Sequence, residues 1–114
     1  MHEISLVQAM MQQLSDLATQ NKATKVLKIT IEIGLLSGVV VDSFRFGFEV
    51  LSGNDDLVRG AELEIITKPV TYRCTQCGFT EESVAKPDCC PQCREVFFLP
   101  EGGDDLILQQ VEME

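Results

Sequence analysis

Two pairs of cysteines in the second half of the chain have the spacing of a metal site. Cys74 and Cys77 form one CxxC pair, Cys90 and Cys93 form the other, and twelve residues separate the pairs. A CxxC turn places two sulfurs on the same side of a short loop, and two such turns complete a tetrahedron around Zn²⁺. Thiolates favour zinc or iron over magnesium or calcium. The spacing therefore predicts a zinc site, which is structural because four protein thiolates leave no open position for water.

Disulfides are the alternative interpretation of these cysteines. They would require an oxidising compartment, and the N-terminus has neither the basic region nor the apolar region of a signal peptide. We therefore expect a cytoplasmic protein with reduced thiols. The fifth cysteine, Cys89, directly precedes Cys90. Since Cys90 repeats the spacing of the first pair and leads into Pro91, we assign Cys90 as the ligand and Cys89 as a bystander, with a redox or alternative-ligand role as the second option.

The composition argues against several classes of function. The 114 residues include 18 acidic and 9 basic side chains, for a formal net charge of −9. Nucleic-acid binding depends on Lys and Arg contacts to phosphate, so we expect no nucleic-acid partner. No apolar run approaches the length of a membrane span. The only histidine is His2, and the chain has no phosphate loop, no GxGxxG motif and no base to activate a serine, so we expect no enzymatic activity.

His2 is the second candidate metal ligand. An imidazole at position 2 is next to the α-amine and the first backbone amides, and these nitrogens form a nearly planar chelate when the amine is free. Planar nitrogen donor sets suit Ni(II) or Cu(II). The alternative is a frayed, solvated terminus, which is the usual state of N-terminal residues. A helix that begins almost at residue 1, with Glu3 in its first turn, would instead present the donors on a fixed platform.

Hydrophobic periodicity predicts the elements that must position these residues. Apolar side chains at helical spacing indicate two helices, and strict alternation indicates three strands. The expected helices span residues 3–20 and 44–51, and the expected strands span residues 26–33, 61–67 and 106–113. Asp42 or Ser43 is a plausible N-cap of the second helix. The predicted fold class is α+β, with two helices packed on a three-stranded sheet and a four-cysteine zinc ribbon or knuckle inserted before the last strand.

Four sequence features occur together over essentially the whole chain: the MHEISL start, the IGLLS segment at residues 33–37, the CxxC and CPxC pairs, and a last strand after Gly-Asp. This combination resembles the HypA/HybF family of nickel metallochaperones for [NiFe]-hydrogenase maturation. The resemblance implies Ni²⁺ transported at His2, with the terminal amine or nearby backbone nitrogens such as those of Met1 and Glu3. It also implies structural Zn²⁺ at Cys74, Cys77, Cys90 and Cys93.

The resemblance also implies partners, and the predicted strands on either side of the cysteine segment imply a domain division. The partners are the GTPase HypB and the precursor of the [NiFe]-hydrogenase large subunit, with urease maturation factors in some members. We expect residues 1–68 plus 102–114 to form a nickel-binding α/β domain and residues 69–101 to form a zinc-binding domain, in a monomer or weak homodimer. The rival function is a zinc-ribbon module that binds protein or nucleic acid.

The sequence departs from the family at one position. Many members have an acidic residue shortly after the Gly-x-x-Ser segment, and an ungapped comparison places Val40 there. Asp42, two residues later, is either a substitute oxygen ligand for nickel or only the cap of the second helix. We favour the cap.

Overall fold

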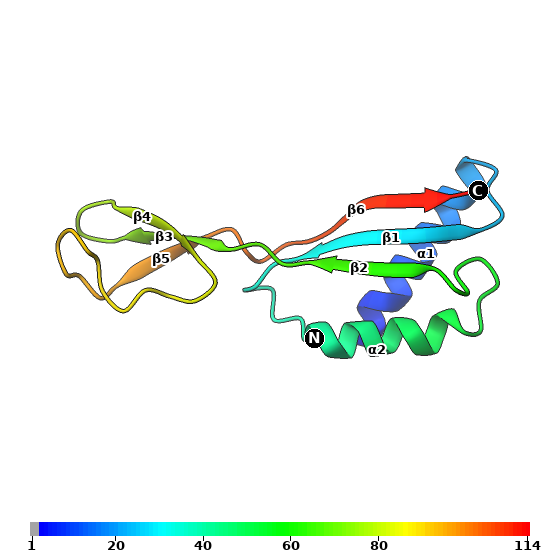
Figure 1. Cartoon of the computed structure of the whole chain (residues 1–114), viewed down its shortest axis with the longest axis horizontal. Helices are drawn as coiled ribbons and strands as arrows, with labels where there is room; N and C mark the ends of the chain where they lie inside the picture. Colours follow the sequence, from blue (N-terminus) through cyan, green and yellow to red (C-terminus); the bar gives the residue numbers. More distant parts are fainter. Residues whose placement is uncertain (1–2) are drawn as a thin grey trace.

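The molecule is elongated and has two parts, as the computed structural model of residues 3–114 shows (Figure 1). Its principal extents are 56 × 24 × 18 Å. The elements in chain order are α1 (Glu3–Gln20), β1 (Val26–Ile33), α2 (Val41–Ser52), β2 (Glu62–Ile66), β3 (Val70–Cys74), β4 (Thr80–Ser83), β5 (Phe98–Glu101) and β6 (Leu106–Met113). We call residues 3–66 with 106–114 the helical part, and residues 70–101 the cysteine part. The predicted α+β class is confirmed.

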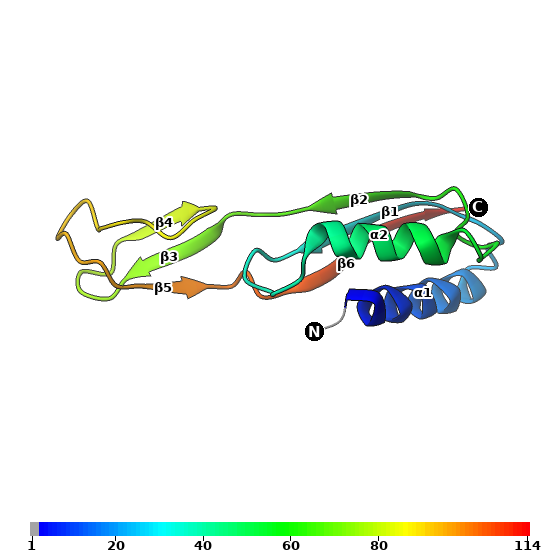
Figure 2. The same ribbon diagram turned by 90° about the horizontal axis from the view of Figure 1, so that it is seen from below.

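The helical part is a three-stranded sheet with both helices on one face. The strand order is β2-β1-β6, with β1 parallel to β2 and antiparallel to β6. The parallel pair requires a crossover, and α2 provides it. Figure 2 shows the two helices side by side along the sheet. Among residues 3–114, neither helix is long and apolar enough to cross a membrane.

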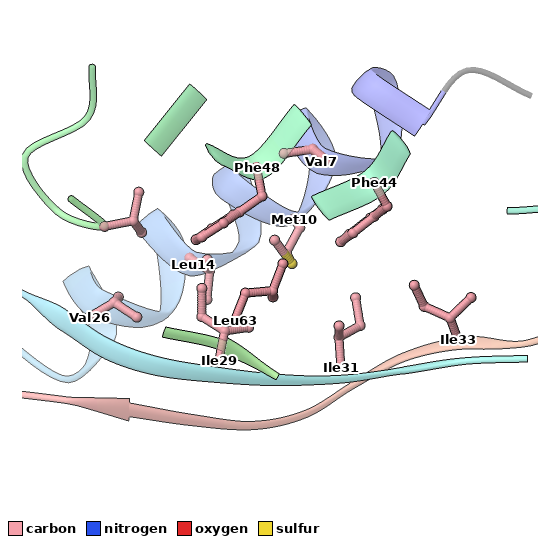
Figure 3. Close-up of a cluster of buried hydrophobic side chains, with 11 residues drawn as sticks. Val7, Met10, Leu14, Val26, Ile29, Ile31, Ile33, Phe44, Phe48 and Leu63 are labelled. Atoms are coloured by element: carbon pink, nitrogen blue, oxygen red, sulfur yellow. The ribbon is translucent and has the colours of Figure 1, made fainter. Parts of the chain in front are cut away.

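The core of the helical part lies between the helices and the sheet (Figure 3). Alternation along β1 directs every second side chain to the helices, and Ile29, Ile31 and Ile33 are all buried. They meet Leu14 from α1 and Phe44 from α2. The predicted first helix and first strand are therefore confirmed, with the same boundaries.

The second helix begins earlier than predicted. Val40 is the N-cap residue of α2, in an extended conformation and without a side-chain capping bond, so the assignment of Asp42 or Ser43 as the cap is wrong. The helix starts closer to the N-terminus than expected because the backbone N–H of Phe44 already donates to the carbonyl of Val40 at 3.0 Å. Asp42 lies in the first helical turn, where its carboxylate interacts favourably with the positive end of the helix dipole.

The cysteine part contains a sheet of its own, which the sequence pattern did not reveal. Its strand order is β4-β3-β5, and both pairs are antiparallel. Val70, Tyr72 and Phe98 are buried in one cluster with Cys74 and Cys90.

The two parts meet where the loop after β1 crosses the segment before β6. The N–H of Gly34 donates to the carbonyl of Asp105 at 2.7 Å, and the N–H of Leu36 donates to the carbonyl of Gly103 at 2.6 Å. A Cβ at Gly34 would overlap the Gly103 carbonyl oxygen. Glycine is thus required at position 34 by close backbone approach.

Candidate metal centre

The structure brings the four thiols of the two CxxC pairs together at the far end of the cysteine part. All four Sγ atoms lie within 4.8 Å of one another. The Cys74 and Cys93 sulfurs are 3.5 Å apart, and the Cys77 and Cys90 sulfurs are 3.6 Å apart. A tetrahedron with zinc–sulfur bonds of 2.3 Å has edges of about 3.8 Å. The thiols are free, and their spacing fits a zinc tetrahedron.

The first pair is held by a tight backbone turn at the end of β3. The N–H of Cys74 donates to the carbonyl of Phe79 at 2.7 Å, and the carbonyl of Cys74 accepts from the N–H of Gly78 at 3.2 Å. Gly78 has φ of 77°, in the left-handed region that glycine adopts without a steric penalty. The turn buries Cys74 and leaves Cys77 exposed.

The second pair repeats the same hydrogen bonds. The N–H of Cys90 donates to the carbonyl of Glu95 at 2.8 Å, and the carbonyl of Cys90 accepts from the N–H of Arg94 at 2.8 Å. Arg94 stands where Gly78 stands in the first turn, and it has φ of 65°. Left-handed backbone at a non-glycine residue costs about 1–2 kcal/mol. Sequence analysis did not single out Arg94, because no glycine marks the second turn.

Cys89 lies outside this cluster. Its side chain is exposed, whereas Cys90 is fully buried and is one of the four clustered thiols. Within residues 3–114 these four cysteines are the one group of His, Cys, Asp or Glu side chains close enough to share a metal ion. The structure therefore places Cys90, and not Cys89, in position to bind.

The thiols of the cluster differ in acidity. The backbone N–H of Cys77 stabilises the Cys74 thiolate and lowers the pKa of Cys74 to about 7. At Cys93 the N–H of Glu95 also favours the thiolate, but burial and the neighbouring thiols together raise its pKa to about 12. Several neighbouring thiolates repel one another unless a cation compensates them. Binding of a divalent metal therefore releases protons from this cluster.

The predicted nickel ligands belong to the first three residues of the chain. Met1 and His2 lie outside the described residues. Glu3 is the first residue of α1 and is half-buried in its first turn. Beside it, the start of α1 packs on the middle of α2, where a Cβ at Gly47 would be 3.2 Å from Cδ1 of Ile4. Asp42 is exposed in the first turn of α2.

Comparisons with known proteins agree over the whole chain. A family model described as "Hydrogenase/urease nickel incorporation, metallochaperone, hypA" matches residues 1–113. A protein of Alkalilimnicola ehrlichii named hydrogenase maturation factor HypA is 34% identical over 114 residues, covering 100% of both chains. A protein of the same name from Campylobacter jejuni is 35% identical over 116 residues, covering 99% of both.

Solved structures share the fold. The solution structure of the Ni metallochaperone HypA from Helicobacter pylori matches with a TM-score of 0.68 at 24% identity, covering 99% of this chain and 97% of that one. A second structure, titled "Solution structure of HypA protein", matches with a TM-score of 0.69 at 23% identity, covering 100% and 97%. Both parts of the molecule are thus included in the likeness.

Proposed function

Because the chain belongs to the HypA family of nickel metallochaperones for hydrogenase maturation, we propose that it binds Ni(II) through His2 and delivers it to the hydrogenase precursor. One observation carries this proposal: the family match includes the N-terminus and extends over residues 1–113. The same match argues against the rival function of a nucleic-acid-binding zinc ribbon, as does the net charge of −9.

The proposed nickel donors are nitrogens. They are the His2 imidazole, the α-amine of Met1 and backbone nitrogens including that of Glu3. The helical geometry of α1 from Glu3 onward supports this proposal, because a helix directly after the donors restrains the chain that carries them. Val40 has no donor side chain at the position where many members have an acid.

Nickel is the cargo of this protein, so its binding must be reversible. A few nitrogen donors at a chain terminus can be replaced one at a time by the ligands of a receiving protein. The imidazole and the amine must each lose a proton before they bind, so nickel affinity is expected to fall as the pH is lowered through their pKa values. These steps transfer a metal ion, and we propose that the chain catalyses no reaction.

We propose that Zn²⁺ at Cys74, Cys77, Cys90 and Cys93 is structural. The near-tetrahedral spacing of the thiols supports this assignment, and the bound metal would hold residues 69–101 together as a zinc-binding domain. Residues 1–68 plus 102–114 would then form the nickel-binding domain.

We further propose the GTPase HypB and the precursor of the [NiFe]-hydrogenase large subunit as partners, with urease maturation factors as additional ones. The family description, which includes hydrogenase and urease, supports this choice. We place the protein in the cytoplasm, where its thiols would stay reduced, as a monomer or weak homodimer.

Nickel titration by calorimetry tests the nickel site. We expect one binding event for the untagged protein, and its loss in His2→Ala and in a variant with extra residues before Met1. The extended variant isolates the contribution of the amine, because it keeps the imidazole and removes only the adjacent free amine. Zinc content should be the same in all three. Equal nickel affinity in the three proteins would contradict the proposal.

A further inference from the structure

The outer seam between α1 and α2, on the side away from the sheet, contains two hollows. One lies at the start of α1 and has a volume of about 330 Å³, and its lining includes Ile4, Phe46 and Val50. The other lies further along the same seam, has a volume of about 400 Å³ and is lined by residues that include Met11 and Leu51. The first hollow is bounded by α1 and α2, and the second by α1, the end of α2 and the loop residues Asn54 and Asp55, so the two follow one another along α1.

The residues of the seam form one stripe on each helix. On α1 the stripe contains Ile4, Gln8 and Met11, at spacings of four and three. On α2 it contains Phe46 and Val50. Three of these side chains are exposed, Phe46 at 66%, Val50 at 48% and Ile4 at 43%, whereas Met11 is half-buried against the core. Large apolar side chains that are grouped and exposed mark an interaction surface more often than scattered ones do.

The net charge of the two helices indicates which charge a ligand of the seam should carry. Glu3, Asp16, Asp42 and Glu49 are the acidic residues of α1 and α2, and Arg45 is their one basic residue, so the helical layer has a net charge of −3 (one positive minus four negative). Arg45 is directed to the sheet, where its Nη1 donates to the carbonyl of Leu63 at 3.1 Å. The outer seam therefore favours a cationic ligand.

Lys28 of β1 and Lys68, which lies between β2 and β3, do not neutralise this surface. Lys28 lies on the strands, where its Nζ is 2.9 Å from a carboxylate oxygen of Glu64. Lys68 pairs with Glu32 at 2.8 Å. Neither α1 nor α2 contains a lysine. An acidic, partly apolar surface is thus left on the helices.

We propose that the outer α1/α2 seam is a docking groove for a basic amphipathic helix of a partner protein. Residues 4–15 of α1 border both hollows and span about 17 Å at 1.5 Å per residue, which is about three helical turns. An amphipathic helix places apolar anchors at i, i+3 or i+4 and i+7, and such anchors would fill the two hollows in turn. Lysine or arginine side chains beside the anchors would face the acidic helices. This inference goes beyond the proposed nickel site and does not depend on His2.

Peptide binding to the full-length, zinc-loaded protein tests the groove. The probe is a synthetic helical peptide of about 14 residues with leucines at i, i+3 and i+7 and lysines beside them. A matched peptide has glutamate in place of each lysine. We expect the lysine peptide to shift the amide resonances of α1 and α2 in NMR spectra, and the glutamate peptide to bind at least about tenfold more weakly.

Two Phe→Ala variants show which surface of the protein binds the lysine peptide. Phe46→Ala should weaken binding of the lysine peptide by about tenfold or more, because the aromatic ring is the largest exposed anchor of the seam. Phe97→Ala is the matched control, since Phe97 is equally exposed at 66% but belongs to the cysteine part. It should change the dissociation constant by less than about twofold.

A second variant, which changes the charge of the groove, tests the proposal even if Phe46→Ala does not fold. Gln8→Lys combined with Gln12→Lys places two cations at exposed positions of the second hollow and should also weaken binding of the lysine peptide. Gln110→Lys, at an exposed position of β6, is the control and should leave binding of the lysine peptide unchanged. The proposal is overturned by resonance shifts confined to other surfaces, by equal effects of Phe46→Ala and Phe97→Ala, or by absence of binding.

Discussion

The helical part and the cysteine part bury very different amounts of apolar surface. The helical part has a cluster of eleven buried apolar side chains from both helices, β1, β2 and the loop before β2, and partly buried side chains of β6 pack against it. The buried cluster of the cysteine part has five members, and Cys74 and Cys90 are two of them. Segments of fewer than about 40 residues need a metal, disulfides or a partner to fold. The comparison indicates that an apolar core stabilises one part and the metal stabilises the other.

Loss of a thiol ligand is expected to have the largest effect, and it should affect one part alone. A structural zinc site contributes apparent binding energies of about 10–16 kcal/mol to folding. Cys74→Ala should therefore abolish hydrogen-exchange protection of β3 and β5 while β1 stays protected. Cys89→Ser is the control and should behave as the wild type. Retained protection in β3 would show that the cysteine part folds without its metal.

Truncation of a core side chain should have the opposite effect: it should destabilise the helical part and leave the cysteine part unaffected. Phe44 is fully buried between α2 and the sheet, so Phe44→Ala should lower the free energy of unfolding of the helical part by about 3–5 kcal/mol. Zinc affinity, measured by competition with a chelator, should remain unchanged. Phe46→Ala on the same helix is the control, and we expect it to cost less than about 1 kcal/mol because Phe46 is exposed. A fall in zinc affinity in Phe44→Ala would contradict independent stabilisation of the parts.

The junction determines whether the two parts tumble together. Gly34→Ala introduces a Cβ where the Gly103 carbonyl lies, so it should open the crossing and cost roughly 1–3 kcal/mol. NMR relaxation should then give different rotational correlation times for the two parts. Gly38→Ala is the control: Gly38 has a left-handed φ of 80°, but nothing lies within 4 Å of an added Cβ there, so the crossing should stay closed. If both variants left a single correlation time, the crossing would not be what joins the parts.

Arg94→Gly should produce the smallest effect and the only stabilising one. Glycine adopts the left-handed conformation of position 94 without the steric cost that arginine incurs, so we expect a gain of about 0.5–1 kcal/mol in the cysteine part. Resistance to a zinc chelator measures it. The reverse change in the first turn, Gly78→Ala, should weaken zinc retention by a similar amount. Equal chelator resistance of Arg94→Gly and wild type would show that the turn is not strained.

The helical part was predictable because its periodic segments are long. The apolar spacing of residues 3–20 and the alternation of residues 26–33 each extend over a whole element, and both are observed with the predicted boundaries. The start of α2 was not predictable in the same way. Capping preferences point to Asp42 or Ser43, but the helix begins at Val41, and its N-cap residue Val40 has no capping side chain.

The cysteine part was less predictable from the sequence. Cysteine spacing identified the four thiols that the structure brings together, because a CxxC turn has a local geometry. The three strands around them are only four or five residues long, and their buried side chains pack against the thiols instead of a broad apolar layer. Such short segments carry too little periodicity to be recognised. The predicted donors at Met1 and His2 lie outside the described residues.

X-ray absorption at the zinc and nickel edges tests the account most directly, in one sample of untagged protein with one equivalent of each metal. The account predicts four sulfur neighbours at about 2.3 Å around zinc and only nitrogen and oxygen neighbours around nickel. His2→Ala should change the nickel spectrum and leave the zinc spectrum as it was. Sulfur neighbours around nickel, or nitrogen and oxygen neighbours around zinc, would contradict the assignment of nickel to the N-terminal donors and of zinc to the four cysteines.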